Sequence, residues 1–278
     1  MEYMDKMDQV LNSTDYIDQE GCVCCGVCHT RKQQRIQWPL FDGTGRMTEH
    51  VVTVPCKCEL ERDEKEKADR LEREHRDCVS RLQSVCFNSP ARKEHTFDHA
   101  VMIRPEIVKM AKHFVDEWET VKRENTGYLF WGDCGTGKSY TAACIANALM
   151  EKEIPVLMRN MSDFLNLSFE KQATLCEEIG RYGLVIFDDL GAERGTEYGL
   201  ESVFRAINAR CESGKPTIIT TNLSLKELMN PYDHAHKRIY ERVIEMCVPV
   251  QFSGPSIRPH IQQHKKTVLK KIFSGGFN

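Results

Sequence analysis

Gly132-Asp133-Cys134-Gly135-Thr136-Gly137-Lys138-Ser139 matches the phosphate-binding pattern G-x-x-x-x-G-K-[ST] at every fixed position. In such a loop the backbone N–H groups surround phosphate oxygens, the lysine reaches the β- and γ-phosphates, and the hydroxyl ligates Mg²⁺. The flanks fit this context, because 127–131 is an apolar run typical of a buried strand and 140–150 is rich in helix-forming residues. A chance match in a loop is the alternative. We expect nucleotide contacts along the whole stretch and at Tyr140 behind it.

Apolar runs and helical runs alternate along the rest of this region. Buried strands are expected at 155–159, 184–189, 216–222 and 247–252, and helices at 105–122, 161–178, 196–213, 225–229 and 233–245. Because strands that alternate with helices form parallel sheets, the pattern predicts an α/β fold.

Two carboxylates, Asp188 and Asp189, follow the apolar run 184–187 and stand 50 residues after Lys138. The carboxyl end of a buried strand lies beside the phosphate loop in this class of sheet. We predict that Asp188 holds Mg²⁺ together with Ser139, and that Asp189 orients or polarises the attacking water.

Polar side chains end the strand expected at 216–222. Asn222, or a threonine before it, can lie between the carboxylates and the γ-phosphate and sense whether that phosphate is present. The alternative is a capping role, because residues 222–224 could cap the next helix.

The composition places the chain among soluble proteins, with 278 residues, 41% hydrophobic and 28% charged. No apolar run approaches the ~20 residues of a membrane span, and the N-terminus lacks the order of a secretory signal, so we expect a cytoplasmic protein without membrane contact. The net charge of −3 gives no global attraction to nucleic acid, so any DNA contact must come from local clusters. Six of the 13 cysteines fall within the first 58 residues, which in a reduced chain indicates metal rather than disulfides.

Two separated cysteine pairs predict a metal site in this N-terminal segment. Cys25-x-x-Cys28 forms a tight turn whose thiolates can point at one ion, and Cys56-x-Cys58 can complete a tetrahedral Cys₄ site suited to Zn²⁺. Free or partner-facing thiols are one alternative. Cys22 and Cys25 make an alternative pair with the same spacing, and Cys24 and His29 are nearby substitute ligands.

Residues 59–85 are dense in Glu, Lys, Arg and Leu and predict one long exposed helix that ends at 88–90. Its narrow apolar seam follows steps of three and four: Ala68, Leu71, His75, Cys78, Leu82 and Val85. The helix either docks on another protein or is a connector that is solvated or lies on its own ATPase domain.

The assembled motifs resemble those of DnaC-like helicase loaders of bacteria and their phages, within the AAA+ ATPases and close to the IstB-type transposition helpers. The resemblance covers most of the sequence and rests on GDCGTGKS, FDDLGAERGTEYGLESVFRAINAR, KPTIITTNLSLKEL, KRIYERV and FSGPSIR. The N-terminal CGVCHT and PCKCE are similar to the zinc module of the phage-type and Gram-positive-type members. A three-layer αβα ATPase core with a parallel sheet is implied.

In this family the active site lies between subunits. The resemblance implies that Arg242 is the arginine finger that reaches a neighbour's γ-phosphate, with Arg238 as second choice, and that Arg258 is the sensor arginine acting in cis. Positive charge there stabilises the transferring phosphoryl group. For each arginine, a surface charge on a helix is the alternative.

Two departures from the AAA+ pattern bear on hydrolysis. Asp189 stands where most members have Glu, so slow or partner-dependent hydrolysis is expected, and Glu193 nearby is not the expected base. Only 20 residues follow Arg258, which leaves no room for the usual four-helix lid. We therefore expect an open nucleotide pocket that assembly closes.

The function implied by the resemblance is that of an ATP-dependent loader, which binds a hexameric DnaB-type replicative helicase through residues 1 to about 90. It would assemble into a ring or spiral and place the helicase on single-stranded DNA. Backbone contacts are expected from Arg194, Arg205 and Arg210. The alternatives are an IstB-like transposition helper acting on a transposase and duplex DNA, and a zinc-bearing adaptor that does not turn nucleotide over.

Four segments are expected in order along the chain. They are a zinc-binding module at 1–58, a charged helix and linker at 59–100, an ATPase domain at 101–263, and a basic tail at 264–278. The tail is expected to be a flexible end rather than a DNA-binding arm.

Overall fold

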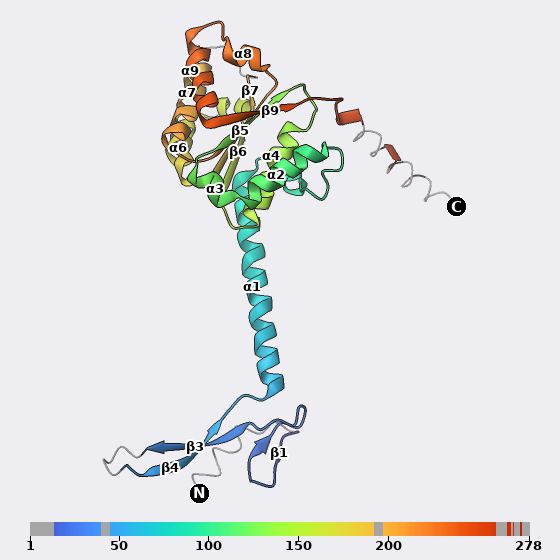
Figure 1. Cartoon of the computed structure of the whole chain (residues 1–278), viewed down its shortest axis with the longest axis vertical. Coiled ribbons are helices and arrows are strands. Elements are labelled where there is room, and N and C mark those ends of the chain that lie inside the picture. The colour runs from blue at the N-terminus through green and yellow to red at the C-terminus, as the bar shows by residue number, and fades with distance from the viewer. Residues whose placement is uncertain are drawn as a thin grey trace. The chain divides into compact units, whose positions relative to one another are not determined.

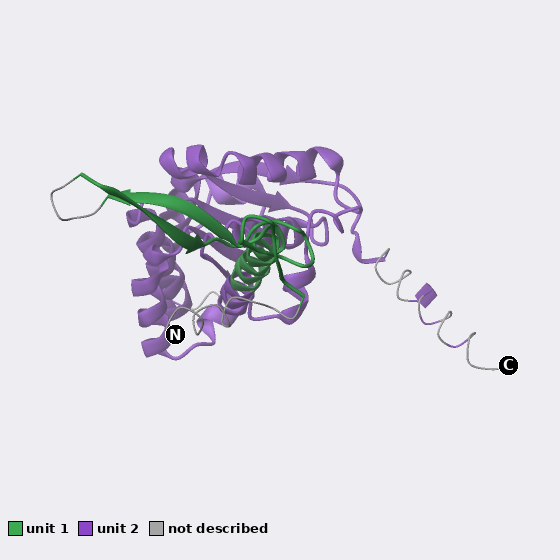
Figure 2. Ribbon diagram, turned by 90° about the horizontal axis from the view of Figure 1, so that it is seen from below, with its two compact units in different colours: residues 1–76 green, residues 77–278 purple. Residues whose placement is uncertain are grey.

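The structure is a computed structural model that describes residues 14–39, 45–191 and 197–259, together with residues 266, 267, 269 and 273. The chain divides into two compact units, 1–76 and 77–278, which Figure 2 colours separately. Glu193, Arg194 and most of the expected basic tail lie outside the described residues. The four-segment division therefore stays a prediction.

The larger unit is built on a five-stranded sheet in the order β6-β7-β8-β5-β9, and every pair of neighbours is parallel. Its strands are β5 (Gly127–Gly132), β6 (Val156–Asn160), β7 (Leu184–Leu190), β8 (Thr217–Thr221) and β9 (Cys247–Phe252). All five were expected from the sequence within two residues at either end. Since β7, β8 and β5 are neighbours, the segments that follow them meet at one edge of the sheet.

Helices cover both faces of this sheet (Figure 1). One face packs against α2 (Pro105–Asp116), α3 (Trp118–Arg123) and α4 (Lys138–Met150). The other face packs against the remaining helices: α5 (Met161–Leu165), α6 (Phe169–Glu178), α7 (Glu197–Glu212), α8 (Leu225–Met229) and α9 (His234–Met246). The expected α/β fold with three layers is confirmed.

Two of the helices expected as continuous are broken. The helix expected at 105–122 divides at Glu117, whose backbone leaves helical geometry (φ −90°, ψ 24°), although Trp118 after it is still buried. The helix expected at 161–178 divides at 166–168, because Ser168 is extended (φ −62°, ψ 155°) and starts α6 anew. Apolar periodicity continues across both breaks, so it could not reveal them.

The long charged helix is α1 (Lys57–Cys86), close to its expected range. Its residues 61–74 are all exposed, whereas Leu82 and Cys86 near its end join the hydrophobic core of the larger unit. Arg159 of β6 donates hydrogen bonds to the carbonyl oxygens of Cys86 and Val85, at 2.8 Å and 3.1 Å, and so caps the helix. The last turns are thus a connector on the ATPase core, while Ala68 and Leu71 of the predicted seam are uncovered.

The smaller unit contains two short antiparallel sheets. The first pairs β1 (Tyr16–Ile17) with β2 (Val23–Cys24), and the second pairs β3 (Gln33–Pro39) with β4 (Met47–Thr53). The β3–β4 ribbon was not predicted, although the alternating residues 33–38 and the β-branched run 51–53 were a signal for it. In the described parts of the chain, no helix has the length and apolar character required to cross a bilayer.

Candidate nucleotide site and cysteine cluster

The phosphate loop joins β5 to α4 as the motif requires. Gly135 and Gly137 adopt left-handed backbone angles, with φ of 81° and 98°. A side chain on Gly137 would collide with Ile103, and one on Gly135 would collide with Ser256. Glycine is therefore needed at both positions, and the loop keeps its backbone N–H groups at the N-terminus of α4, where an anion is stabilised.

Lys138 is buried and donates to three oxygens: the carbonyls of Gly132 and Asp133, each at 2.7 Å, and the side-chain Oδ1 of Asn222 at 2.9 Å. Burial lowers the pKa of its ammonium group, although neighbouring acids oppose that effect. A phosphate that enters the loop must exchange for these internal acceptors.

Asp188 and Asp189 lie at the end of β7, where the register with β8 shifts after Phe187. Asp188 is 2% exposed, and its Oδ1 accepts a 2.7 Å hydrogen bond from the Thr220 hydroxyl. The same hydroxyl accepts the backbone N–H of Asp189 at 2.9 Å. Thr220 therefore holds both carboxylate residues in place. It is one of the threonines before Asn222 that the sequence analysis named as an alternative site residue.

Asp189 has a left-handed backbone (φ 65°), which is uncommon for a residue with a side chain and marks local strain. Its Oδ1 accepts a 2.8 Å hydrogen bond from Asn222 Nδ2. Because Asn222 also accepts from Lys138, one amide joins the lysine to the second carboxylate. With this backbone geometry the Asp189 side chain is hydrogen-bonded to the Asn222 amide. Its predicted role is to orient the attacking water.

Arg92 is a member of the site that sequence reasoning missed. It lies in a 3-10 turn, Pro90–Glu94, and its guanidinium donates to Asp188 Oδ2 at 2.7 Å. A polar linker residue with no motif around it gives no local signal for such a role. Only the fold brings it to the end of β7.

A cavity of about 340 Å³ collects most of the predicted nucleotide residues. Its lining includes Lys138, Ser139, Tyr140, Asp188, Asp189, Asn222 and Arg258. A hydroxyl and carboxylates are oxygen donors of the kind Mg²⁺ prefers, and the loop supplies N–H groups and an ammonium for phosphate. The residues present therefore fit a Mg²⁺–nucleotide complex.

The two arginines predicted as fingers lie on α9, away from the residues that line this cavity. Arg242 pairs with Glu245 at 2.8 Å on the same helix. Arg238 lies over the ring of Phe204, 3.9 Å from its centroid. Neither lines the cavity of its own chain, and the role of a finger acting on a neighbour stays a prediction.

Arg210 was predicted to contact DNA, and that prediction is wrong. Its side chain is fully buried and donates to Thr217 Oγ1 and to four carbonyl oxygens, those of Ile179, Tyr182, Gly183 and Pro216, at 2.6–3.2 Å. Loss of hydration lowers the pKa of Arg210 to about 10. Arg205 is half-buried over the ring of Phe169 and stays a candidate, while Arg194 is outside the described residues.

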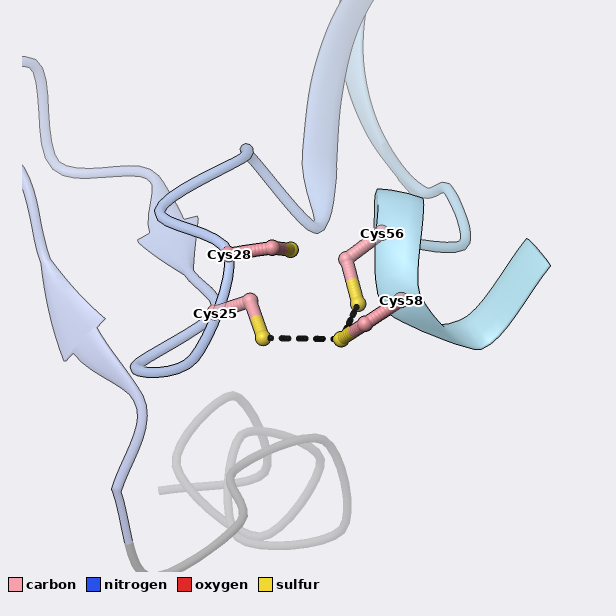
Figure 3. A group of neighbouring side chains, drawn as sticks. All are labelled: Cys25, Cys28, Cys56 and Cys58. Atoms are coloured by element: carbon pink, nitrogen blue, oxygen red, sulfur yellow. Dashed lines mark hydrogen bonds between the residues drawn. The ribbon is translucent and has the colours of Figure 1, made fainter. Parts of the chain in front are cut away.

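The N-terminal cysteines meet as the spacing predicted (Figure 3). The ligand atoms of Cys25, Cys28, Cys56 and Cys58 all lie within 4.8 Å of one another. Cys58 Sγ is 3.4 Å from Cys25 Sγ and 3.2 Å from Cys56 Sγ. Four thiols so placed are the donor set of a closed structural zinc site.

The substitute ligands do not join this group. Cys24 Sγ is paired with Asp18 at 3.8 Å, and the His29 ring contacts Tyr16. Within the cluster, a hydrogen bond from the Thr30 hydroxyl lowers the pKa of Cys28 to about 5, whereas the neighbouring thiols raise the pKa of Cys58. The turn 25–28 is tight, because a side chain on Gly26 would collide with the carbonyl of Thr14.

An ion cluster around the buried Lys32 lies next to the cysteines in the sequence and in space. Lys32 is 4% exposed, and its Nζ lies 2.9 Å from Asp15 Oδ2 and 3.0 Å from Glu59 Oε1. Glu59 in turn accepts the backbone N–H of Cys56 at 3.0 Å. This chain of contacts ties the first turn of α1 to the cysteine-bearing segment.

With this geometry established, comparison with known proteins settles the family. The profile of the family described as IstB-like ATP binding protein matches residues 64–267. The chain belongs to this family. The expected place in the DnaC and IstB group of ATPases is thereby confirmed.

Two curated relatives of this IstB-like chain are helicase loaders. The replicative helicase loader DnaI of Bacillus subtilis is 25% identical over 181 residues, which cover 59% of this chain and 58% of DnaI. The replicative helicase loader DnaC of Escherichia coli is 25% identical over 125 residues, which cover 42% of this chain and 50% of DnaC. The chain thus spans about half the length of the curated relatives it matches.

Among solved structures, a crystal structure of DnaI is similar with a TM-score of 0.51 at 22% identity. The similarity covers 63% of this chain and 98% of that one. It shows that the core of the IstB-like chain shares the fold of that protein.

Proposed function

We propose that this protein is an ATP-dependent loader that binds a hexameric replicative helicase of the DnaB type and delivers it onto single-stranded DNA. The observation that carries the proposal is the convergence of Lys138, Ser139, Asp188 and Asn222 on one cavity, in a family whose curated relatives include helicase loaders. The helicase and the DNA come from those relatives and from the sequence resemblance.

ATP would bind with its phosphates in the loop 132–139, and Ser139 and Asp188 would hold Mg²⁺. The ion supplies charge stabilisation of the transferring phosphoryl group. Asp189 would orient the attacking water, and Arg242 would arrive from the next subunit of a ring or spiral. Since Asp189 is held by Asn222 in the single chain, hydrolysis is slow until a partner rearranges the site.

The cysteine cluster would hold Zn²⁺ and stabilise the smaller unit, which would carry the helicase contact. A deletion that tests this contact should end before the core of the larger unit begins. Cys86 and Phe87 are buried in the ATPase core, so a deletion of 1–90 would damage the core itself. A deletion of 1–76 removes one compact unit and leaves the other whole.

Co-purification with the host's replicative helicase, with and without ATP, tests the proposal. The full chain is expected to retain the helicase in an ATP-dependent manner, whereas the 1–76 deletion should lose it and still bind nucleotide. Lys138→Ala should lose nucleotide and show no ATP dependence. A deletion variant that retains the helicase would overturn the assignment of the contact to the smaller unit.

The IstB-like helper is the second candidate, because the matching family profile carries that description. The two functions differ in their DNA. ATP turnover stimulated by single-stranded DNA and helicase supports the loader, while turnover stimulated by duplex DNA and a transposase supports the helper. Nucleotide binding without turnover under either condition would indicate an adaptor.

A further inference from the structure

Asp188, the carboxylate predicted to hold Mg²⁺, is almost fully buried. Both of its side-chain oxygens accept hydrogen bonds. Thr220 donates to Oδ1, and the guanidinium of Arg92 lies 2.7 Å from Oδ2. Thr220 is neutral, so Arg92 is the cation paired with this buried carboxylate. A buried carboxylate without a cation is costly, which explains why a charged group stands there.

The backbone of Arg92 is anchored independently of its side chain. Asn147 of α4 is 4% exposed, and its Nδ2 donates to the carbonyl oxygens of Arg92 and His95, both at 2.9 Å. Asn147 Oδ1 accepts from Gln83 Nε2 of α1 at 3.0 Å. The turn 90–94 is therefore fixed to the helix that begins with Lys138.

The guanidinium, in contrast, can leave without unfolding the turn. The Arg92 side chain is 23% exposed, whereas that of Asp188 is 3% exposed. A rotation of the side chain would break the ion pair and keep both backbone hydrogen bonds from Asn147. Only the side chain of Arg92 has to move for Asp188 to take another cation.

We propose that Arg92 competes with Mg²⁺ for Asp188, and that a Mg²⁺–nucleotide complex must displace its guanidinium from this carboxylate. The inference rests on the proposed ATP site. Both cations seek the same carboxylate, and two positive charges beside one buried anion repel each other. Arg92 therefore raises the Mg²⁺ concentration that nucleotide binding requires. It also keeps Asp188 paired with a cation until the Mg²⁺–nucleotide complex binds.

A Mg²⁺ titration of the binding of a fluorescent ATP analogue to the full chain tests this role. Arg92→Met is expected to need about tenfold less Mg²⁺ than the wild type, the factor that corresponds to one charge-assisted hydrogen bond. Arg92→Lys keeps the charge and should lie between the two. Lys93→Met changes the neighbouring cation and leaves the ion pair of Arg92 with Asp188 in place, so it should match the wild type. Affinity in EDTA should change less than about threefold in every variant, because the phosphate loop is intact.

Thermal unfolding gives a second readout that does not depend on activity. Arg92→Met leaves Asp188 unpaired, so it should unfold at lower temperature than the wild type without ligand. Added Mg²⁺–ATP analogue should raise its unfolding temperature more than that of the wild type, because the ion then supplies the missing cation. If Arg92→Met does not fold, the same comparison is made with Arg92→Lys.

Each outcome separates this role from the others. An unchanged or higher Mg²⁺ requirement in Arg92→Met, with normal binding by the wild type, overturns the displacement of Arg92 and leaves the ATP site intact. A loss of affinity in EDTA would make Arg92 a phosphate contact instead. Failure of the wild type to bind the analogue, or normal binding by Lys138→Ala, would overturn the nucleotide site itself.

Discussion

Replacement of Thr220 by valine separates the hydroxyl from the shape of the side chain. Valine has nearly the volume of threonine, so the packing between β7 and β8 should persist. What is lost is one bridge, because the hydroxyl donates to Asp188 Oδ1 at 2.7 Å and accepts the N–H of Asp189 at 2.9 Å. Thr220 is 1% exposed, so water cannot easily replace it.

The magnitude follows from the two orphaned groups. A buried group left without its hydrogen-bond partner costs about 1–3 kcal/mol, and a charged one costs more. We expect Thr220→Val to lower the free energy of unfolding of the ATPase unit by about 2–4 kcal/mol. Thr220→Ser keeps the hydroxyl and loses one methyl group, which costs about 1 kcal/mol.

Turnover should fall more than nucleotide binding. With Asp188 and Asp189 less well fixed, ATP hydrolysis stimulated by helicase and single-stranded DNA is expected to drop at least about tenfold, which is ~1.4 kcal/mol of barrier. Affinity for the ATP analogue should change less than about threefold, since the loop 132–139 is untouched. Urea denaturation and steady-state turnover measure the two effects. A valine variant as stable and as active as the serine variant would refute the reasoning.

Four further predictions follow from other contacts. Arg210→Met removes every hydrogen bond of that buried side chain and should cost about 3 kcal/mol in urea denaturation, while Arg205→Ala should cost little; normal stability with weakened DNA binding would instead restore Arg210 as a DNA contact. Lys32→Met removes the cation shared by the buried carboxylate of Asp15 and the partly exposed carboxylate of Glu59, so hydrogen exchange in residues 14–39 and 45–60 should rise, and unaltered exchange would show that the ion cluster is dispensable. Cys58→Ser should lower bound zinc from about one equivalent to below about 0.2, whereas Cys24→Ser should retain it; equal metal content in the two would count against the Cys₄ site. Arg242→Ala should spare nucleotide affinity and abolish turnover in the assembled state, and weaker binding by the isolated subunit would contradict the finger role.

Most residues of the nucleotide site could be predicted from local sequence motifs. The phosphate loop has fixed spacings, and an apolar strand that ends in Asp188-Asp189 reports its own place at the edge of the sheet. Asn222 followed from the same argument on the next strand. These residues could be predicted because strand order in a parallel sheet converts positions in sequence into neighbours in space.

Arg92 and Arg210 show where that argument ends. Arg92 meets Asp188 across 96 residues of sequence, and nothing in the linker encodes the meeting. Arg210 did carry a signal, because Val203 and Ile207 place it on the inward face of α7 at helical spacing. The prediction followed its charge instead, and the carbonyl oxygens that accept its hydrogen bonds come from two separate segments, 179–183 and 216.

Asn222 connects two functional side chains of the nucleotide site through its side-chain amide. Lys138 donates to Asn222 Oδ1, and Asn222 Nδ2 donates to Asp189. When Lys138 turns to a γ-phosphate, Asn222 loses the donor that fixes its amide, and its hold on Asp189 weakens as a result. We infer that capture of the phosphate by Lys138 and release of Asp189 for its water are one coupled event. Asn222→Ala should therefore uncouple them, with turnover lost and nucleotide affinity retained, and a variant whose affinity and turnover fall by the same factor would refute the coupling.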